Sequence, residues 1–228
     1  MTISTISQAI NNGTKVNSYT PSHVLLAGSA FVGNLLVITA GIRTASAVNL
    51  VPPPGFTKLG ADINVGINTL SIAWRLSDGT ENSKTLQWAG TTPSNTLMWD
   101  TSFTAFGGTY YDLSSFSAIE NVTGGASANS VPGTAIVVPA GSRAYSYPFA
   151  RPTVDTNNPY PMTLTGGGSL SQLTGNPFTT AHAVALGFGT WTPTVSFSNS
   201  CSDRILRAFL LTEAPIPKSN LSLLLCEA

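Results

Sequence analysis

The sequence predicts an all-β protein in which two antiparallel sheets pack as a β-sandwich of jelly-roll-like topology. No window of twelve residues shows a 3.6-residue period, whereas several segments alternate apolar and polar residues as half-buried strands do. The 15 prolines and 21 glycines are spread along the chain and divide it into short segments. A length of 228 residues is compatible with one β domain. We predict an N-terminal arm at residues 1–20, a β-sandwich domain at 21–214 and an apolar C-terminal tail at 215–228.

The chain carries few charges. Only 9% of its residues are charged, its formal net charge is zero and 42% of its residues are hydrophobic. No cluster of lysine or arginine is present to neutralise phosphates, so we expect no nucleic-acid partner. Low charge also leaves an isolated monomer little electrostatic protection against association, which favours a protein that works inside an assembly.

The N-terminal third contains the arm and the first predicted strands. Residues 1–20 hold Asn11-Asn12-Gly13 and scattered isoleucines, and we expect this arm to become ordered mainly against another molecule. It lacks the basic and long apolar stretches of a secretory signal. Val24 to Ile42 has no charge over 19 residues, which is long enough for a membrane span. The turn-type pair Gly33-Asn34 interrupts it, so we predict two buried strands and no membrane partner.

Apolar patterns predict the later strands. Leu70 to Leu76 alternates apolar and polar residues, which predicts a half-buried strand ending in the turn Ser77–Thr80. Leu35 to Ile42 and Ala135 to Val138 are continuous apolar runs, as expected for strands covered on both faces. Alternation with a period of two returns at Val184, Leu186 and Phe188, and again at Val195 and Phe197.

Two segments outside these patterns are candidates for contact with other molecules. Residues 139–162 mix prolines, aromatics and two arginines, which suits a long loop better than a strand, and loops of this length are usually functional or mobile. After the closing Pro215-Ile216-Pro217, the apolar run Leu221–Leu225 is costly to leave in water. We expect this tail to pack on its own domain or to add to a neighbour.

The sequence offers little that could carry catalysis. His23 and His182 stand in no metal-ligand spacing with another histidine or cysteine, and the cluster Gly166–Ser169 lacks the ending of a phosphate-binding loop. We read that cluster as a flexible turn. The acidic residues are scattered, whereas a glycosidase needs two of them across a sugar cleft. We therefore predict no enzyme, no catalytic residue, no metal site and no cofactor.

Two further possibilities stay open. Asp100 and Asp112 flank an aromatic segment that could line a carbohydrate groove or simply belong to a packed strand. Its aromatic residues are Phe103, Phe106, Tyr110 and Tyr111. Cys201 and Cys226 could pair or could both be free thiols, because their separation in sequence does not show whether they meet in space.

The order of several segments resembles a β-sandwich domain of tailed-bacteriophage virion proteins. Gly33-Asn34-Leu35-Leu36 resembles a strand motif of the type Gly-Asp-Leu-Leu, with Asn34 in place of the acid. Pro53-Pro54-Gly55-Phe56-Thr57 resembles a Pro-Pro-x-Gly-Trp-Thr turn, with Phe56 for tryptophan and without the spacer residue. Leu70 to Gly79 and Arg204 to Leu211 resemble the long strand and the closing strand of that domain.

The resemblance implies a structural protein at the virion surface, assembled in the host cytoplasm. Such domains occur in capsid-exterior and in tail-fibre proteins, but this chain lacks the heptads or fibrous repeats of a fibre shaft. We therefore expect a capsid decoration (cement) protein, trimeric by analogy, whose partner is the major capsid protein. The alternative is a tail-fibre or receptor-binding adhesin that contacts host glycans. The predicted contact residues are Tyr145, Tyr147, Phe149, Arg151, Tyr160, Leu221, Leu223 and Leu225.

Overall fold

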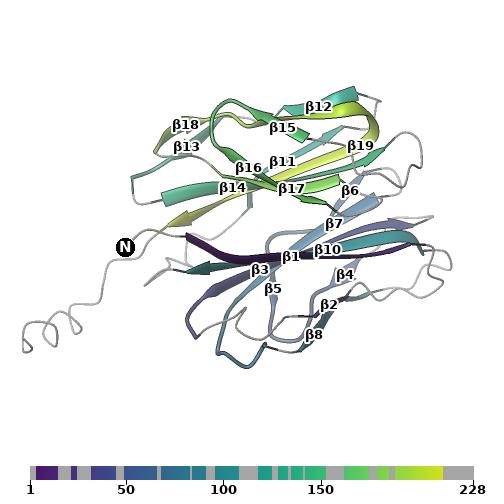
Figure 1. Cartoon of the computed structure of the whole chain (residues 1–228), viewed down its shortest axis with the longest axis vertical. Helices are drawn as coiled ribbons and strands as arrows, with labels where there is room; N and C mark the ends of the chain where they lie inside the picture. The colour runs from purple at the N-terminus through teal and green to yellow at the C-terminus, as the bar shows by residue number, and fades with distance from the viewer. Residues whose placement is uncertain are drawn as a thin grey trace, which may run out of the picture.

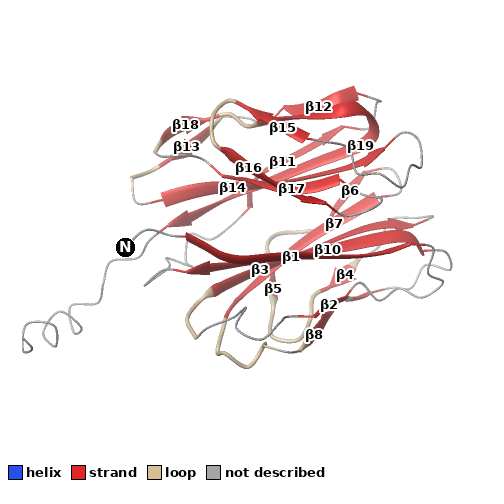
Figure 2. Ribbon diagram, viewed as in Figure 1, coloured by secondary structure: helices blue, strands red, loops and turns tan. Residues whose placement is uncertain are grey.

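A computed structural model describes most of the chain. The described residues are 4–14, 22–24, 32–44, 49–65, 68–82, 84–90, 96–107, 118–124, 128–132, 135–140, 142–152, 162–174, 179–184 and 188–212. They form strands, turns and connecting segments and include no helix, so the all-β prediction is confirmed for this part of the chain (Figure 2).

The first large sheet has six antiparallel strands. In spatial order they are β1 (Ser4–Thr14), β10 (Thr96–Gly107), β3 (Leu35–Thr44), β7 (Asn68–Leu76) and β5 (Thr57–Lys58), and β6 (Ile63–Val65) also pairs with β7. Because β3 and β10 pair from Leu35↔Phe106 to Thr96↔Thr44, the centre of this sheet is built from long strands.

The second large sheet has seven antiparallel strands. Its main order is β11 (Ala118–Gly124), β19 (Thr194–Thr212), β14 (Ser142–Pro152), β17 (Thr179–Val184) and β16 (Ser169–Thr174). The strands β12 (Ala128–Pro132) and β15 (Met162–Thr165) pair with the first part of β19. The long β19 therefore holds four other strands.

Three two-stranded ribbons complete the described structure. They are β2 (Ser22–Val24) with β8 (Thr85–Gln87), β4 (Leu50–Val51) with β9 (Ala89–Gly90), and β13 (Ile136–Val138) with β18 (Gly189–Trp191). Figure 1 shows the two large sheets as separate layers, with β2, β4 and β8 beyond the six-stranded sheet. The six-stranded sheet thus lies between the seven-stranded sheet and these short strands.

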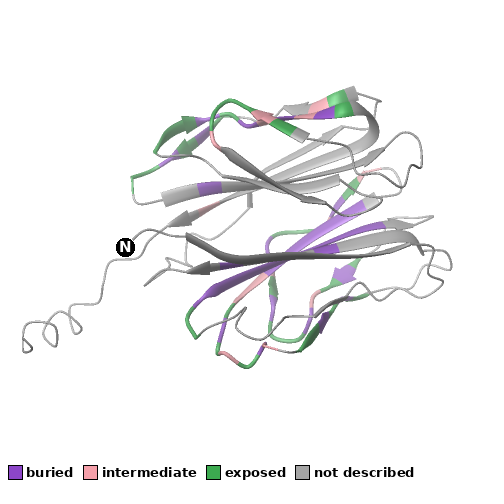
Figure 3. Ribbon diagram, viewed as in Figure 1, coloured by how far each residue is buried: buried purple, intermediate pink, exposed green. Residues whose placement is uncertain are grey.

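The central strand β3 is buried on both faces. Leu35, Leu36, Val37 and Ile38 are all solvent-inaccessible, which confirms the expectation for this apolar run (Figure 3). One face belongs to the main core cluster, which also draws on β7, β10, the ribbons and a turn. The members of that cluster are Leu36, Ile38, Ala40, Ile42, Leu50, Phe56, Ala73, Leu86, Trp88 and Ala105.

The neighbouring strand β7 departs from its predicted half-buried pattern. Residues 69–73 are buried regardless of which face they lie on, and Leu76, predicted to share the apolar face, is exposed. The cause is that β7 lies between β3 and the short strands β5 and β6, in a sheet with both faces covered. The predicted turn after β7 is present, and Gly79 there has a φ of 82°.

The described part of the segment considered as a membrane span, Val24 to Ile42, contains the last residue of β2 and most of β3. Strand β2 ends at Val24, and β3 begins at Leu35 just after the predicted turn, where Gly33 has a φ of 83°. The amide of Gly33 donates to the carbonyl oxygen of Ser77 at 2.9 Å, which joins this turn to the end of β7. Among the described residues no helix has the length and apolar character needed to cross a membrane.

Two predictions about irregular segments need correction. Ser4–Thr14, assigned to an arm ordered against another molecule, is strand β1 and pairs with β10 of the same chain. Ser142–Pro152, assigned to a long loop, is strand β14 and pairs with β19 along its whole length. The prolines of this segment favoured a loop over a strand in the sequence analysis. Pro148 is tolerated in the strand because it lies where pairing with β17 is interrupted, so no hydrogen bond to β17 is lost there. The remaining bounds of the domain and the assignment of residues 215–228 to a tail stay predictions.

Two apolar patterns also end differently from their prediction. In β13, Ile136 and Val138 are buried but Val137 is exposed, so the run Ala135–Val138 is covered on one face only. Phe188, expected to share the buried face of a strand with Val184, is also exposed, because β17 ends at Val184. The alternation at Val195 and Phe197 is confirmed, since both are buried.

Candidate functional site

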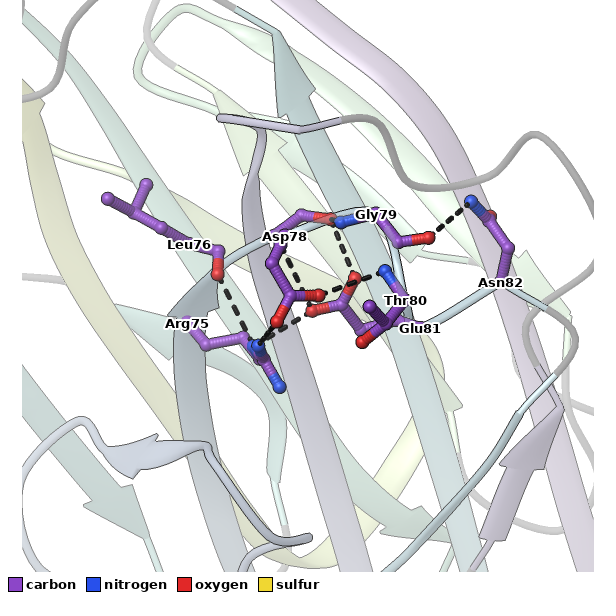
Figure 4. A network of polar contacts seen from close by, with 8 residues as sticks. Arg75, Leu76, Asp78, Gly79, Thr80, Glu81 and Asn82 are labelled. Carbon is purple, nitrogen blue, oxygen red and sulfur yellow. Dashed lines mark hydrogen bonds and ion pairs between the residues drawn. The ribbon is translucent and has the colours of Figure 1, made fainter.

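The densest polar network in the described structure surrounds the turn that follows β7 (Figure 4). Arg75, at the end of β7, is its centre. Its Nη2 donates to Asp78 Oδ2 at 2.9 Å, and its Nε lies 2.9 Å from Glu81 Oε1. The Nε also lies 3.3 Å from the carbonyl oxygen of Leu76. One guanidinium therefore holds two carboxylates and a backbone carbonyl of the same turn.

Glu81 is the buried member of this network. Its side chain is 2% exposed, and its second oxygen accepts a hydrogen bond of 2.7 Å from the hydroxyl of Ser77. The same hydroxyl oxygen accepts the amide of Gly79 at 3.0 Å. Since a buried carboxylate is costly unless it is paired and hydrogen-bonded, these two partners explain why Glu81 can stay buried.

Arg75 also joins this turn to a second one. Its guanidinium lies over the ring of Phe56, 5.8 Å from the centroid, within the range of a cation–π interaction. Phe56 is a core residue that follows the turn Pro53–Gly55, and its amide donates to the carbonyl oxygen of Pro53 at 3.1 Å. A Cβ added at Gly55 would approach Arg75 Nη1 to 2.8 Å, so glycine leaves room for the arginine. The sequence motif at 53–57 is thus a turn that supports Arg75.

Asp78 is the exposed carboxylate of the network. Hydrogen bonds from the side chain and the backbone of Thr80 lower the pKa of Asp78 below its ordinary value, and the charge of Arg75 lowers it further. The ionised form is therefore favoured in the folded state. The cause is turn geometry, with the Thr80 amide donating to Asp78 Oδ1 at 2.9 Å.

A second ion pair fixes the short strands near the other end of β7. Asp62 Oδ2 accepts Lys58 Nζ at 2.9 Å and the backbone amide of Leu50 at 2.7 Å. Lys58 Nζ also donates to Asn49 Oδ1 at 2.9 Å. These bonds connect the start of β4 to the segment between β5 and β6. As in the Arg75 network, charge holds irregular backbone in place.

Chemically, both networks are suited to holding the fold. They contain paired carboxylates and cations, but each carboxylate already has a cation and further donors as partners. Within the described ranges, no three side chains among histidine, cysteine, aspartate and glutamate group as a metal site would. The expectation that the chain is not an enzyme stays a prediction.

The predicted contact residues of the aromatic segment lie in strand β14. Tyr145, Tyr147, Phe149 and Arg151 occupy alternate positions of this strand. In the register with β19 they lie opposite Phe209, Arg207, Ile205 and Asp203, respectively. Because β14 pairs with β17 on one edge and β19 on the other, it has no free edge for a strand of another molecule. Contact with a partner would have to use its faces.

The other predicted site residues fall partly outside the described structure. Tyr160, Leu221, Leu223 and Leu225 lie outside the described residues, as do Tyr110, Tyr111, Asp112 and Cys226. Asp100, Phe103 and Phe106 lie in β10, His23 in β2, His182 in β17 and Cys201 in β19. The interface, the glycan groove and the cysteine pairing therefore stay predictions.

The exposed apolar pair Val137 and Phe188 was missed by the sequence reasoning. Val137, in β13, is 69% exposed, and Phe188, which directly precedes β18, is 80% exposed. A signal existed for one of them, because Phe188 stands between two glycines, where a regular buried strand is improbable. For Val137 the run of apolar neighbours concealed the exposure.

The turn Gly166–Gly168 was expected to be flexible, but it has a specific partner. Its three glycines all have positive φ, and the indole Nε1 of buried Trp191 donates to the carbonyl oxygen of Gly167 at 2.9 Å. This bond fastens the turn between β15 and β16 onto the ribbon strand β18. It satisfies the polar atom of a buried tryptophan.

Comparison with models of protein families, with curated proteins and with solved structures finds no match for this chain.

Proposed function

We propose that this chain is a non-enzymatic structural protein of a bacteriophage virion, acting as a decoration protein on the capsid exterior. In this proposal the two large sheets pack as a jelly-roll-like β-sandwich, the protein is a homotrimer and it bridges and stabilises subunits of the major capsid protein. The observation that carries the proposal is the order of its scaffold motifs. The Gly33-Asn34 turn before β3, the Pro53–Phe56 turn and the Asp78-Gly79 turn after β7 follow one another as in the virion domain they resemble.

The use of charge is consistent with a structural role. In the described part of the chain, Arg75, Asp78 and Glu81 hold one turn, and Lys58 and Asp62 hold another segment. A body with internally paired charges and no net charge can pack against many neighbours without strong repulsion. Apolar surface buried between copies contributes roughly 25 cal/mol per Å², repeated at every contact around a shell.

The proposed contacts lie on β14 and in the tail. Residues 145–151 present aromatic and arginine residues at alternate positions of a strand whose edges are occupied, so a capsid subunit would meet a face of the sheet. Aromatic residues and arginine are enriched in protein interfaces. The leucines at 221, 223 and 225 would add apolar contacts at the end of the chain.

Deleting residues 215–228 tests the role of the tail in the particle. We expect lower occupancy of the truncated protein on purified particles and lower thermal stability of the shell, compared with full-length protein. Unchanged occupancy together with unchanged shell stability would show that the tail makes no contribution.

The copy number of the protein in purified particles tests the proposed location. A decoration protein should approach the abundance of the major shell subunit on a stained gel. A tail-fibre protein or adhesin would be far scarcer, and that result would contradict the decoration role.

A further inference from the structure

The ribbon of β13 and β18 has one buried face and one exposed face, and exposed apolar side chains occur on the ribbon and directly before it. Ile136, Val138 and Trp191 are buried, whereas Val137 and Phe188 are among the most exposed large hydrophobic side chains of the described residues. Val137 pairs with Thr190 in the ribbon, and Phe188 lies two residues before Thr190. We call the exposed pair Val137 and Phe188 the ribbon patch.

The ribbon patch differs from a chance exposure. Single apolar residues on a surface are ordinary, but here one exposed apolar residue lies in β13 and a second directly precedes its partner strand β18. Their exposed neighbours Ala135, Pro139 and Thr190 carry no charge. A patch of this kind fits an uncharged apolar segment rather than a charged ligand.

The chain itself carries such a segment close to the patch. Strand β19 ends at Thr212, which lies opposite Ser142 at the start of β14. Strand β13 ends at Val138, shortly before Ser142, and β13 and β14 contact each other. The chain therefore leaves the seven-stranded sheet near the ribbon.

The tail is long enough to reach the patch. At about 3.3 Å per residue, the stretch from Thr212 to Leu221 can span up to ~30 Å. By the same measure, the stretch from Val138 to Ser142 spans at most ~13 Å. From Ser219 to Cys226 the sequence has no charge, and Leu221, Leu223 and Leu225 would share one face of an extended segment.

We propose that the segment Leu221–Leu225 folds back onto the ribbon patch of the same chain. The docking removes leucine side chains of the tail, together with Val137 and Phe188, from water. It brings together an uncharged leucine segment and an uncharged apolar patch, both of which are costly to leave in water. The inference concerns the isolated protein and does not depend on the proposed role in a virion.

Trypsin provides a direct test, because Lys218 lies three residues before the start of the docked segment at Leu221. Full-length protein is digested under native conditions, and the loss of residues 219–228 is followed by intact-mass spectrometry. When opening is fast, the cleavage rate follows the population of undocked tail. We expect Phe188→Ser and Val137→Ser each to increase the rate of cleavage after Lys218 by about fivefold to tenfold.

The matched control is Val32→Ser. Val32 is 78% exposed, similar to Val137, but lies in the turn before β3. We expect this variant to be cleaved after Lys218 at the rate of the unmodified protein. All three substitutions replace exposed side chains, so circular dichroism and thermal unfolding should show folded proteins of similar stability.

Equal cleavage rates for Phe188→Ser, Val137→Ser and the unmodified protein would overturn the proposal. Protection that weakens on dilution would also overturn it, because the tail would then dock on another copy. Neither result bears on the virion role, which the abundance in particles tests separately.

Discussion

Removing the buried carboxylate of the Arg75 network should destabilise the protein strongly. In Glu81→Ala, Ser77 loses its acceptor at 2.7 Å and Arg75 loses its most buried partner at 2.9 Å. Loss of one partner of a buried ion pair typically costs about 3–5 kcal/mol. Arg75 remains 22% exposed and keeps Asp78 and the Leu76 carbonyl, so we place the loss at the lower end, about 3 kcal/mol.

Glu81→Gln separates the charge of this residue from its shape. The glutamine oxygen can still accept the hydroxyl of Ser77, but its amide replaces the carboxylate oxygen beside Arg75. A hydrogen bond to a charged group contributes about 1.5–3 kcal/mol, so we expect a loss of about 2 kcal/mol for this variant. The order Glu81→Ala, then Glu81→Gln, then unmodified protein follows from the two contacts.

Urea unfolding followed by tryptophan fluorescence measures these losses, since Trp88 is buried in the core. With a slope of about 3 kcal/mol per M, a loss of 3 kcal/mol lowers the midpoint by about 1 M. The matched control is Asp78→Ala, which removes the exposed carboxylate bound to the same arginine. If Asp78→Ala lowered the midpoint as much as Glu81→Ala, burial of Glu81 would not be the cause of its importance.

Three further predictions concern turns, burial and pH. Gly166→Ala should lower the free energy of unfolding by at least about 2 kcal/mol, because φ is positive and the new Cβ would overlap the carbonyl of residue 192. Gly167→Ala, which also has a positive φ but open space around it, should cost about 1 kcal/mol, and thermal or urea unfolding compares the two variants. Val37→Ala, at a fully buried position, should cost about 2–3 kcal/mol in the same assay, and Val32→Ala, at an exposed position outside the ribbon patch, less than about 0.5 kcal/mol. The pKa of Asp78 is lowered in the folded state, so its carboxylate contributes to stability above the ordinary pKa of 3.8, and this contribution is lost as the pH falls through the folded pKa. We therefore expect the urea midpoint of Asp78→Asn to fall less between pH 6 and pH 3 than that of the unmodified protein.

The sequence predicted correctly those strands in which the burial of each residue follows its apolar or polar character. Leu35–Ile42 is apolar without interruption and is buried on both faces, and Val195 and Phe197 alternate with polar residues and are buried. The turns at Gly33-Asn34 and Asp78-Gly79 were predictable for a similar reason. Glycine at these positions takes the positive φ that other residues adopt only at a cost.

Burial on a given face could not be read from the same patterns. Ala135–Val138 and Leu35–Ile42 look alike in sequence, yet Val137 is 69% exposed whereas residues 35–42 are all buried. Ser71 and Thr69, in contrast, are buried because β7 lies inside a covered sheet. Which sheet faces lie against another layer is a property of the tertiary arrangement, and a period of two cannot report it.

The Arg75 network was only partly foreseeable. Ser77–Thr80 was predicted as a turn, but the burial of Glu81 depends on a partner from β7 and a supporting ring from residue 56. Strand β14 was concealed by its prolines, although its aromatic and small residues alternate with a period of two. Both errors arise where distant segments of the chain supply what the local sequence lacks.

The low number of charges in this chain bears on how much apolar surface it can expose to water. With 10 acidic and 10 basic residues in 228, several of them spent on turns, repulsion between molecules contributes little to solubility. To stay in solution, such a protein would benefit from a cover over exposed apolar groups such as Phe188 and Val137. A leucine segment tethered at Thr212 provides this cover at a high effective concentration, which a separate partner would have to match by binding tightly.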